Sequence, residues 1–243
     1  MKRFGLLGKN ISYSFSQGYF TQKFKGLGLE DHTYENFDIQ NIDKFKNVLA
    51  HNNLKGLNVT IPYKQDVIPY LDELDPKAEK IGAVNTIQFT KNGLKGFNTD
   101  AYGFQKSLEP FLKPHHKNAL ILGTGGASKA VRFVLDELGI ASTYVSRSKK
   151  DGQYTYEELD KGIIEKNTLI VNCTPLGTYP NVEEKPALPY QHIGPKHLLY
   201  DLIYNPEKTS FLASGEAKGA TICNGLNMLE HQAEKAWEIW NNV

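Results

Sequence analysis

The chain has few cysteines and no long apolar run, and both absences exclude classes of protein. Only two cysteines, Cys173 and Cys223, occur among 243 residues. Their number and spacing fit neither a disulfide framework nor a zinc site, so we expect a reducing, cytoplasmic setting. No run of about 20 apolar residues occurs, as a membrane-spanning helix requires. The first ten residues also lack the apolar core of a signal peptide. We therefore expect neither secretion by that route nor insertion into a membrane.

The chain also lacks an excess of either charge, because 28 Lys and Arg residues nearly balance 27 Asp and Glu residues. A formal net charge of +1 gives no reason to expect nucleic acid or a membrane surface as a partner. His115 and His116 are adjacent and lack spaced acidic or cysteine ligands, so we expect no metal. What is present is an ordinary apolar share of 40%, enough to build a core in one large domain or two of about 120 residues.

The first hundred residues alternate short strand and helix patterns. Pro62 and Pro76 each stand where a helix begins, since the first helical position needs no N–H. Asn92-Gly93 is a strong hairpin signal between two apolar segments. The expected strands are 4–8, 34–39, 57–61, 83–89 and 94–98, and the expected helices are 16–25, 41–50 and those that begin at Pro62 and Pro76.

The same alternation restarts after a polar, proline-containing stretch at 112–118, which is the best candidate for a domain boundary. The expected strands are 119–122, 142–146, 169–173 and 198–203, and the expected helices are 101–111, 127–138, 156–165 and an amphipathic last helix at 226–241. Strands that alternate with helices favour a parallel sheet covered on both faces. We therefore expect an α/β protein of two domains. These are an N-terminal α/β domain, 1–100 plus 222–243, and a Rossmann-like, doubly wound domain, 101–221.

The most specific motif is the glycine-rich turn between the strand at 119–122 and the helix that follows. Gly123 permits a tight turn, and Gly125 lets the backbone approach a pyrophosphate at the helix N-terminus. The small residues Ala127 and Ser128 let the helix pack closely on the strand. Strand, turn and helix together predict a dinucleotide site; the alternative is a tight turn with no ligand.

The residues after the next strand favour NADP over NAD. The run Ser146-Arg147-Ser148-Lys149 contains no acid to bind the ribose 2′-hydroxyl of NAD, whereas an arginine suits the 2′-phosphate of NADP. The alternative is a solvated basic loop, because charge runs are usually exposed.

Lys64 and Asp100 are the candidate proton-handling groups. Lys64 falls in the first turn of the helix expected from Pro62, where the positive end of the helix dipole disfavours a cation and suits a group that exchanges protons. Asp100 stands where a strand gives way to a helix. The plainer alternatives are an exposed lysine and an aspartate that caps a helix.

Neutral polar residues gather where the expected strands of the first domain end. The carboxyl ends of strands are where open α/β sheets place ligands. Hydroxyls and amides with few charges suit a small polyhydroxy substrate, although each residue alone is also a common turn or cap former. These residues are Ser14, Ser16, Asn58, Thr60, Asn85, Thr86, Asn98 and Thr99.

Seven blocks, in this order, resemble those of the shikimate dehydrogenase family and together span nearly the whole chain. They are NVTIPYK (58–64), GAVNT (82–86), FNTD (97–100), GTGGAS (123–128), NCTPLG (172–177), DLIYNP (201–206) and GLNMLEHQ (225–232). The resemblance implies NADP-linked, reversible reduction of 3-dehydroshikimate to shikimate, in the pathway to aromatic amino acids.

The resemblance also implies that 1–100 plus 222–243 is the substrate-binding, catalytic domain and that 101–221 is the NADP-binding domain. It further implies roles for individual residues. Lys64 and Asp100 match the catalytic pair. The implied substrate-binding residues are Ser14, Ser16, Thr60, Asn85, Tyr204 and Gln232. The implied cofactor-binding residues are Gly123, Gly125, Gly126, Ala127, Ser146, Arg147, Ser148, Lys149, Thr174 and Gly225.

Two segments depart from the family pattern. The usual His-Ser-x-Ser-Pro reads Tyr13-Ser14-Phe15-Ser16-Gln17, which keeps both hydroxyls but lacks the proline. The usual Asn-Arg-Thr reads Ser146-Arg147-Ser148, which keeps the cation. Two alternatives remain: a quinate/shikimate dehydrogenase with relaxed substrate or NAD use, and a non-catalytic NADP-binding regulator. We expect the protein to be a monomer or a homodimer.

Overall fold

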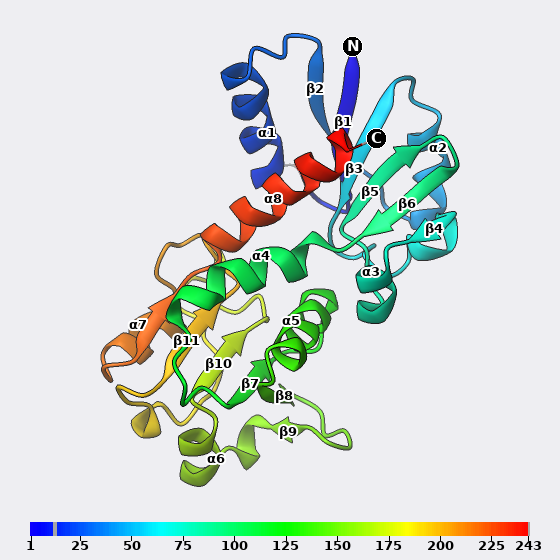
Figure 1. The fold of residues 1–243 in the computed structure, drawn as a ribbon. Coiled ribbons are helices and arrows are strands. Elements are labelled where there is room, and N and C mark those ends of the chain that lie inside the picture. Colours follow the sequence, from blue (N-terminus) through cyan, green and yellow to red (C-terminus); the bar gives the residue numbers. More distant parts are fainter. Residues whose placement is uncertain (12–13, 243) are drawn as a thin grey trace. The chain divides into compact units, whose positions relative to one another are not determined.

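The computed structural model describes residues 1–11 and 14–242, and its contacts form two compact units (Figure 1). The first unit is Met1–Thr99 with Ala233–Val243, and the second is Asp100–Gln232. These units differ from the expected domains by placing Asp100 and residues 222–232 in the second unit. The assignment of substrate to one domain and NADP to the other stays a prediction. Tyr13, one of the departures from the family pattern, lies outside the described residues.

The first unit is built on a mixed six-stranded sheet in the order β2-β1-β3-β5-β6-β4. β1 pairs in parallel with both β2 and β3, whereas β5 runs antiparallel to β3 and to β6. The strands are β1 (Lys2–Gly8), β2 (His32–Asp38), β3 (Leu54–Val59), β4 (Glu73–Leu74), β5 (Thr86–Thr90) and β6 (Gly93–Phe97). The helices are α1 (Phe15–Gly26), η1 (Ile42–Lys44), α2 (Phe45–Leu49), η2 (Ile68–Tyr70) and α3 (Pro76–Ile81).

Alternation along β1 divides the core of the first unit between the two faces of its sheet. Phe4 and Leu6 join an apolar cluster with α1, and Leu7 joins another with α2 and α3. Successive side chains of a strand point to opposite faces, so one short segment supports both clusters. The sheet is therefore covered on both faces, as the sequence predicts.

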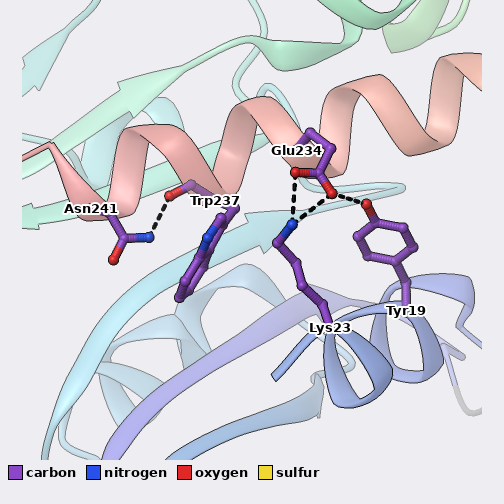
Figure 2. Close-up of polar contacts among 5 residues, drawn as sticks. All are labelled: Tyr19, Lys23, Glu234, Trp237 and Asn241. Atoms are coloured by element: carbon purple, nitrogen blue, oxygen red, sulfur yellow. Dashed lines mark hydrogen bonds and ion pairs between the residues drawn. The ribbon is translucent and has the colours of Figure 1, made fainter. Parts of the chain in front are cut away.

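The last helix, α8 (Leu226–Asn241), contributes its final residues to the core of the first unit. Trp240 is 4% exposed, and its indole Nε1 donates to the carbonyl oxygen of Ile87 at 3.0 Å. Glu234 accepts hydrogen bonds from Lys23, at 2.7 Å, and from Tyr19 (Figure 2). The amphipathic helix expected at 226–241 is thus confirmed, and its aromatic residues serve packing.

The helix expected from Pro62 is absent, and this prediction is wrong. Residues 61–67 form hydrogen-bonded turns, and only the short η2 follows. The carbonyl oxygen of Lys64 accepts the N–H of Val84 at 2.7 Å, which diverts it from a helical ladder. Pro69 also lacks the N–H that a longer helix would need. The helix-dipole argument for Lys64 therefore does not apply.

The hairpin predicted near Asn92-Gly93 is confirmed, with its turn one residue earlier. Thr90 pairs with Gly93, so Lys91 and Asn92 form the two-residue loop. Gly93 has a φ of 118° and closes the turn from within β6. Glycine tolerates this conformation because it has no Cβ.

The second unit contains a parallel six-stranded sheet in the order β12-β11-β10-β7-β8-β9. This is the doubly wound order. In chain order β7 is the first strand of this sheet and β10 the fourth, and the strand order reverses direction between these two neighbours. The strands are β7 (Asn118–Leu122), β8 (Ala141–Ser146), β9 (Tyr154–Thr155), β10 (Leu169–Asn172), β11 (Leu198–Asp201) and β12 (Thr221–Cys223). The helices are α4 (Thr99–Leu108), η3 (Glu109–Phe111), α5 (Gly126–Glu137), η4 (Tyr156–Glu158), α6 (Lys161–Lys166), η5 (Tyr190–His192), α7 (Ser210–Glu216) and the first part of α8.

Two expectations for the second unit need correction. The helix expected at 156–165 is two pieces, η4 and α6, because Asp160 caps α6 by accepting the N–H of Ile163 at 2.8 Å. The polar stretch at 112–118 is no boundary, since the units divide at Thr99 and Asp100. The sequence also gave no sign of α7.

Two features are absent from the part of the chain that the structure describes. Among residues 1–11 and 14–242, no helix is long and apolar enough to cross a membrane. The same residues contain no group of three or more His, Cys, Asp or Glu side chains suited to a metal. His115 and His116 both lie within hydrogen-bond reach of the carbonyl oxygen of Lys196, at 3.0 and 3.3 Å.

Candidate active site

A polar network in the first unit joins several of the expected substrate-binding positions. The Tyr34 hydroxyl donates to Asn58 Oδ1 at 2.8 Å and also hydrogen-bonds the Ser16 side chain. Asn58 Nδ2 in turn reaches Thr86 Oγ1 at 3.3 Å and the Asn85 carbonyl oxygen at 3.4 Å. Tyr34 is 5% exposed, and burial raises its pKa, so its phenol stays protonated. The buried phenol therefore connects Ser16 to the end of β3.

Asn85 continues this network to Thr99, where α4 begins. Its Oδ1 accepts the backbone N–H of Thr99 at 2.7 Å, and its Nδ2 donates to Thr99 Oγ1 at 3.0 Å. Asn85 and Thr99 are 3% and 1% exposed. Asn85 thus satisfies a backbone N–H at the helix start, a role that needs no ligand. The sequence predicted a substrate contact here, and the structure adds this structural duty.

Ser14, Thr60 and Lys64 follow the carboxyl ends of β1 and β3. Ser14 caps α1 by accepting the N–H of Gln17 at 3.4 Å. Thr60 donates its N–H to the Leu7 carbonyl oxygen at 2.9 Å, which places it beside the end of β1. Lys64 is held through its backbone carbonyl by Val84. The fold thus brings the polar residues expected from the sequence to one edge of this sheet.

The glycine-rich turn of the second unit has the predicted form. Gly123 adopts a φ of 93°, which favours glycine, and donates its N–H to the Val145 carbonyl oxygen at 2.9 Å. Gly125 is the N-cap of α5, and a Cβ added to it meets no heavy atom within 4 Å. All residues of α5 are described, and none in its first turn is acidic. The helix N-terminus therefore suits an anion.

Thr174 lies beside this turn, in the loop that follows β10. A Cβ on Gly123 would stand 3.0 Å from Thr174 Cγ2, and the Cys173 N–H donates to the Leu122 carbonyl oxygen at 2.9 Å. The two loops flank the point between β7 and β10 where the strand order reverses. Doubly wound sheets bind dinucleotides at that point.

The loop after β8 carries the basic residues expected to select NADP. Arg147 and Lys149 are exposed, and Lys149 is ion-paired with Glu158 at 2.5 Å. The Lys149 hydrogen bond lowers the pKa of Glu158. Since this carboxylate already pairs with Lys149, Arg147 is the more suitable of the two for a phosphate.

The remaining expected residues of the second unit lie on α4, on α8 and in the loop after β11. Asp100 is 2% exposed and sits in the first turn of α4, past the cap position that the sequence left as an alternative. Gly103 lets α4 meet α8, since a Cβ there would lie 3.1 Å from the Gln232 backbone nitrogen. Tyr204 is half-buried, and burial raises its pKa.

Gly225 has a packing reason that needs no ligand. A Cβ at this position would stand 2.1 Å from the Leu202 carbonyl oxygen, and its N–H donates to the Ile203 carbonyl oxygen at 3.0 Å. The cofactor role that the resemblance implies for Gly225 stays a prediction.

Two buried polar residues that organise these edges, Tyr34 and Asp201, were not among the candidates expected from the sequence. Asp201 is fully buried at the end of β11. An acid after three apolar strand residues was the available signal, because a buried acid needs partners.

A doubly wound sheet with a glycine turn at its reversal point, in one chain with an α/β unit that has a polar sheet edge, defines a two-domain dinucleotide-binding enzyme. Residues 6–87 match the family model described as the shikimate dehydrogenase substrate binding domain. The chain is 38% identical to the shikimate dehydrogenase (NADP(+)) of Methanosphaera stadtmanae, over 97% of this chain and 90% of the relative. The chain belongs to the shikimate dehydrogenase family.

Solved structures agree with this assignment. The crystal structure of shikimate dehydrogenase 1 from Peptoclostridium difficile has a TM-score of 0.88 at 39% identity, over 100% of this chain and 93% of that chain. The shikimate 5-dehydrogenase from Thermus thermophilus, solved in complex with NADP(H) and shikimate, has a TM-score of 0.88 at 32% identity. That match covers 100% of this chain and 94% of the other. The expected two-domain α/β architecture is confirmed.

Proposed function

We propose that this chain is an NADP-dependent shikimate dehydrogenase that reversibly reduces 3-dehydroshikimate to shikimate, an oxidoreductase of aromatic amino-acid biosynthesis. The supporting observation is that two expected cofactor positions, Gly123 and Thr174, flank the reversal point of the second sheet. Relatives named shikimate dehydrogenase (NADP(+)) match nearly the full chain. The open space over Gly125 and the exposed Arg147 fit a pyrophosphate and a 2′-phosphate.

NADP, which the glycine-rich turn and Arg147 would hold, would supply or accept the hydride at carbon 3 of the substrate ring. During reduction the Lys64 ammonium donates a proton to the oxygen of the carbonyl, so that a hydroxyl forms. During oxidation the neutral amine takes that proton back. Asp100, which the resemblance pairs with Lys64, assists this proton transfer. The pair thus acts as a general acid and base.

The remaining assigned side chains orient the ring. Ser14 and Ser16 donate their hydroxyl protons to the substrate carboxylate. Thr60, Asn85 and Gln232 bind the ring hydroxyls, and Tyr204 is a further substrate-binding residue. Fixing both reactants in one geometry lowers the barrier by several kcal/mol, about 7–11 at most. Gly126, Ala127, Ser146, Ser148 and Gly225 complete the proposed cofactor loops.

The test is an absorbance assay of NADPH formation with shikimate, followed by quinate and then by NAD⁺. Lys64→Ala should lower kcat about 10²- to 10⁴-fold while NADP⁺ binding is retained. Lys46→Ala, an exposed lysine on α2, is the matched control and should keep full turnover. A fully active Lys64→Ala variant would refute the assignment of the proton donor.

The same assay separates the alternatives. A relaxed quinate/shikimate dehydrogenase would turn over quinate or use NAD⁺ with comparable kcat/KM. A non-catalytic regulator would bind NADPH and show no turnover with any of these compounds. Retention of both Lys64 and Asp100 favours the enzyme.

Partners and location complete the proposal. We infer a small-molecule substrate as the binding partner, no nucleic acid or membrane, a monomer or homodimer, and a cytoplasmic setting. Light scattering during gel filtration measures the oligomeric state directly.

A further inference from the structure

Asp201 is a buried carboxylate that the proposed reaction does not use. It ends β11, has 0% exposure, and accepts three hydrogen bonds. Its Oδ1 accepts from Asn172 Nδ2 at 3.0 Å and from the Ile203 N–H at 3.1 Å, and its Oδ2 accepts from Thr209 Oγ1 at 2.6 Å. A buried carboxylate is costly unless such donors satisfy it. Its position therefore calls for an explanation.

The hydrogen bond to Asn172 fixes how that amide is oriented. An ionised carboxylate only accepts, so it must face the Asn172 NH₂ group. The amide oxygen then faces the opposite way, where it accepts the Thr174 N–H at 3.0 Å and the Thr174 hydroxyl at 2.7 Å. Asn172 is itself 0% exposed, so water cannot replace these partners. The carboxylate thus sets the position of Thr174 through one intervening side chain.

The other contacts of Asp201 fix the loop that leads to Tyr204. The Ile203 N–H bonds to the same Oδ1, and the Thr209 hydroxyl bonds to Oδ2 from the cap of α7. One carboxylate therefore joins the loop after β10 to the loop after β11. These loops carry Thr174, an expected cofactor residue, and Tyr204, an expected substrate residue.

We propose that Asp201 is a positioning residue of the shikimate dehydrogenase reaction, which orients the Asn172 amide and thereby holds Thr174 in place for the dinucleotide. This inference rests on the proposed function. In the protonated form the carboxyl group also donates, so the Asn172 amide is no longer constrained to one orientation. A flipped amide would set its NH₂ group against the Thr174 N–H, and the loop would lose its anchor.

Near pH 6 Asp201 changes charge, whereas the titratable groups that face it do not. Burial raises the pKa of Asp201 to about 6, and its three donors partly oppose that rise. The titratable groups that face it are Cys173, Tyr190 and Tyr200, and burial raises the pKa of each far above neutrality, with a smaller contribution from the Asp201 charge. All three remain protonated where Asp201 changes charge.

The experiment measures kcat and KM for NADP⁺ and for shikimate between about pH 5.5 and 8.5, in wild type, Asp201→Asn and Asp201→Ala. The asparagine variant imitates the protonated carboxyl at every pH. Since the 2′-phosphate of NADP⁺ also titrates near 6, the readout is the ratio of variant KM to wild-type KM at each pH. Asp160→Asn is the control, because Asp160 also accepts a backbone N–H but caps α6.

We expect the NADP⁺ KM of Asp201→Asn to exceed that of wild type about three- to tenfold above pH 7, the equivalent of one lost hydrogen bond. The ratio should approach one near pH 5.5, where wild type is also protonated. Asp201→Ala should raise this KM at every pH, and Asp160→Asn at none. A ratio of one throughout, or a loss of thermal stability with unchanged KM, overturns the proposal.

Failure of the two proposals is distinguishable. Wild type without shikimate oxidation refutes the proposed function, whereas active wild type with a flat ratio refutes only the role of Asp201. If Asp201→Ala does not fold, the pH profile of Asp201→Asn alone decides.

Discussion

Tyr34→Phe tests whether the buried network of the first unit prepares the substrate site. The change removes one hydroxyl and keeps the ring, which stacks on Phe20 with centroids 4.7 Å apart. Asn58 Oδ1 loses its donor at 2.8 Å, and Ser16 loses its phenolic partner. A buried acceptor left without its donor costs about 1–3 kcal/mol.

We expect this loss to appear both in stability and in substrate binding. The Tm should fall by several degrees, since 1 kcal/mol corresponds to about 2–4 °C at this size. The KM for shikimate should rise about three- to tenfold, because Ser16 is no longer held in place, while the KM for NADP⁺ stays unchanged. Absorbance assays and thermal unfolding followed by circular dichroism measure both quantities.

A matched control separates the substrate effect from general destabilisation. Tyr190→Phe also removes a part-buried hydroxyl, which donates to the Pro186 carbonyl oxygen at 2.9 Å in the second unit. It should lower the Tm and leave the KM for shikimate unchanged. If Tyr34→Phe behaves like this control, the network only stabilises the fold and our reasoning is refuted.

Three further predictions concern single positions. Arg147→Ala should raise the KM for NADP⁺ about tenfold and leave that for NAD⁺ nearly unchanged, in steady-state assays, because only NADP⁺ carries the 2′-phosphate; equal effects on both cofactors would contradict this role. Burial raises the pKa of Asp201 from 3.8 to about 6, so the folded chain binds this proton more tightly than the unfolded chain. In urea unfolding, the free energy of unfolding of wild type should therefore fall by up to about 3 kcal/mol relative to that of Asp201→Asn as pH rises from about 4 to 6. A difference between the two proteins that does not change with pH would contradict the burial effect. Gly56→Ala should destabilise the chain by about 1–3 kcal/mol, because the added Cβ would lie 2.3 Å from the Trp240 indole; thermal unfolding that matches wild type would show that the indole moves aside freely.

Sequence patterns predicted those parts of the fold that depend on the backbone preferences of neighbouring residues. Gly123 was predictable because only a positive φ turns the chain between β7 and α5, and the structure gives it a φ of 93°. The hairpin was predictable from Asn92-Gly93, although the register that makes Lys91 and Asn92 the loop depends on pairing along both strands.

The failures occurred where distant residues compete for a backbone group. Pro62 has every local sign of a helix start, but Val84, twenty residues away from Lys64, takes the Lys64 carbonyl. The same limit applies to the site. Family resemblance supplied Ser16 and Thr174, whereas their supports Tyr34 and Asp201 are visible only when strands distant in sequence are adjacent.

The part of α8 that belongs to the first unit, from Ala233 to Asn241, also affects the order in which the two units are completed during synthesis. Strands β1 to β6 are synthesised before the second unit, yet the apolar cluster on β1 and β2 includes Ala236, Trp237 and Trp240, which follow that unit in the sequence. The second unit is one continuous segment, and its sheet is complete before those residues appear. The first unit is thus begun before the second unit and completed after it. Both tryptophans of the protein lie in this segment, so their fluorescence reports the moment at which that core closes.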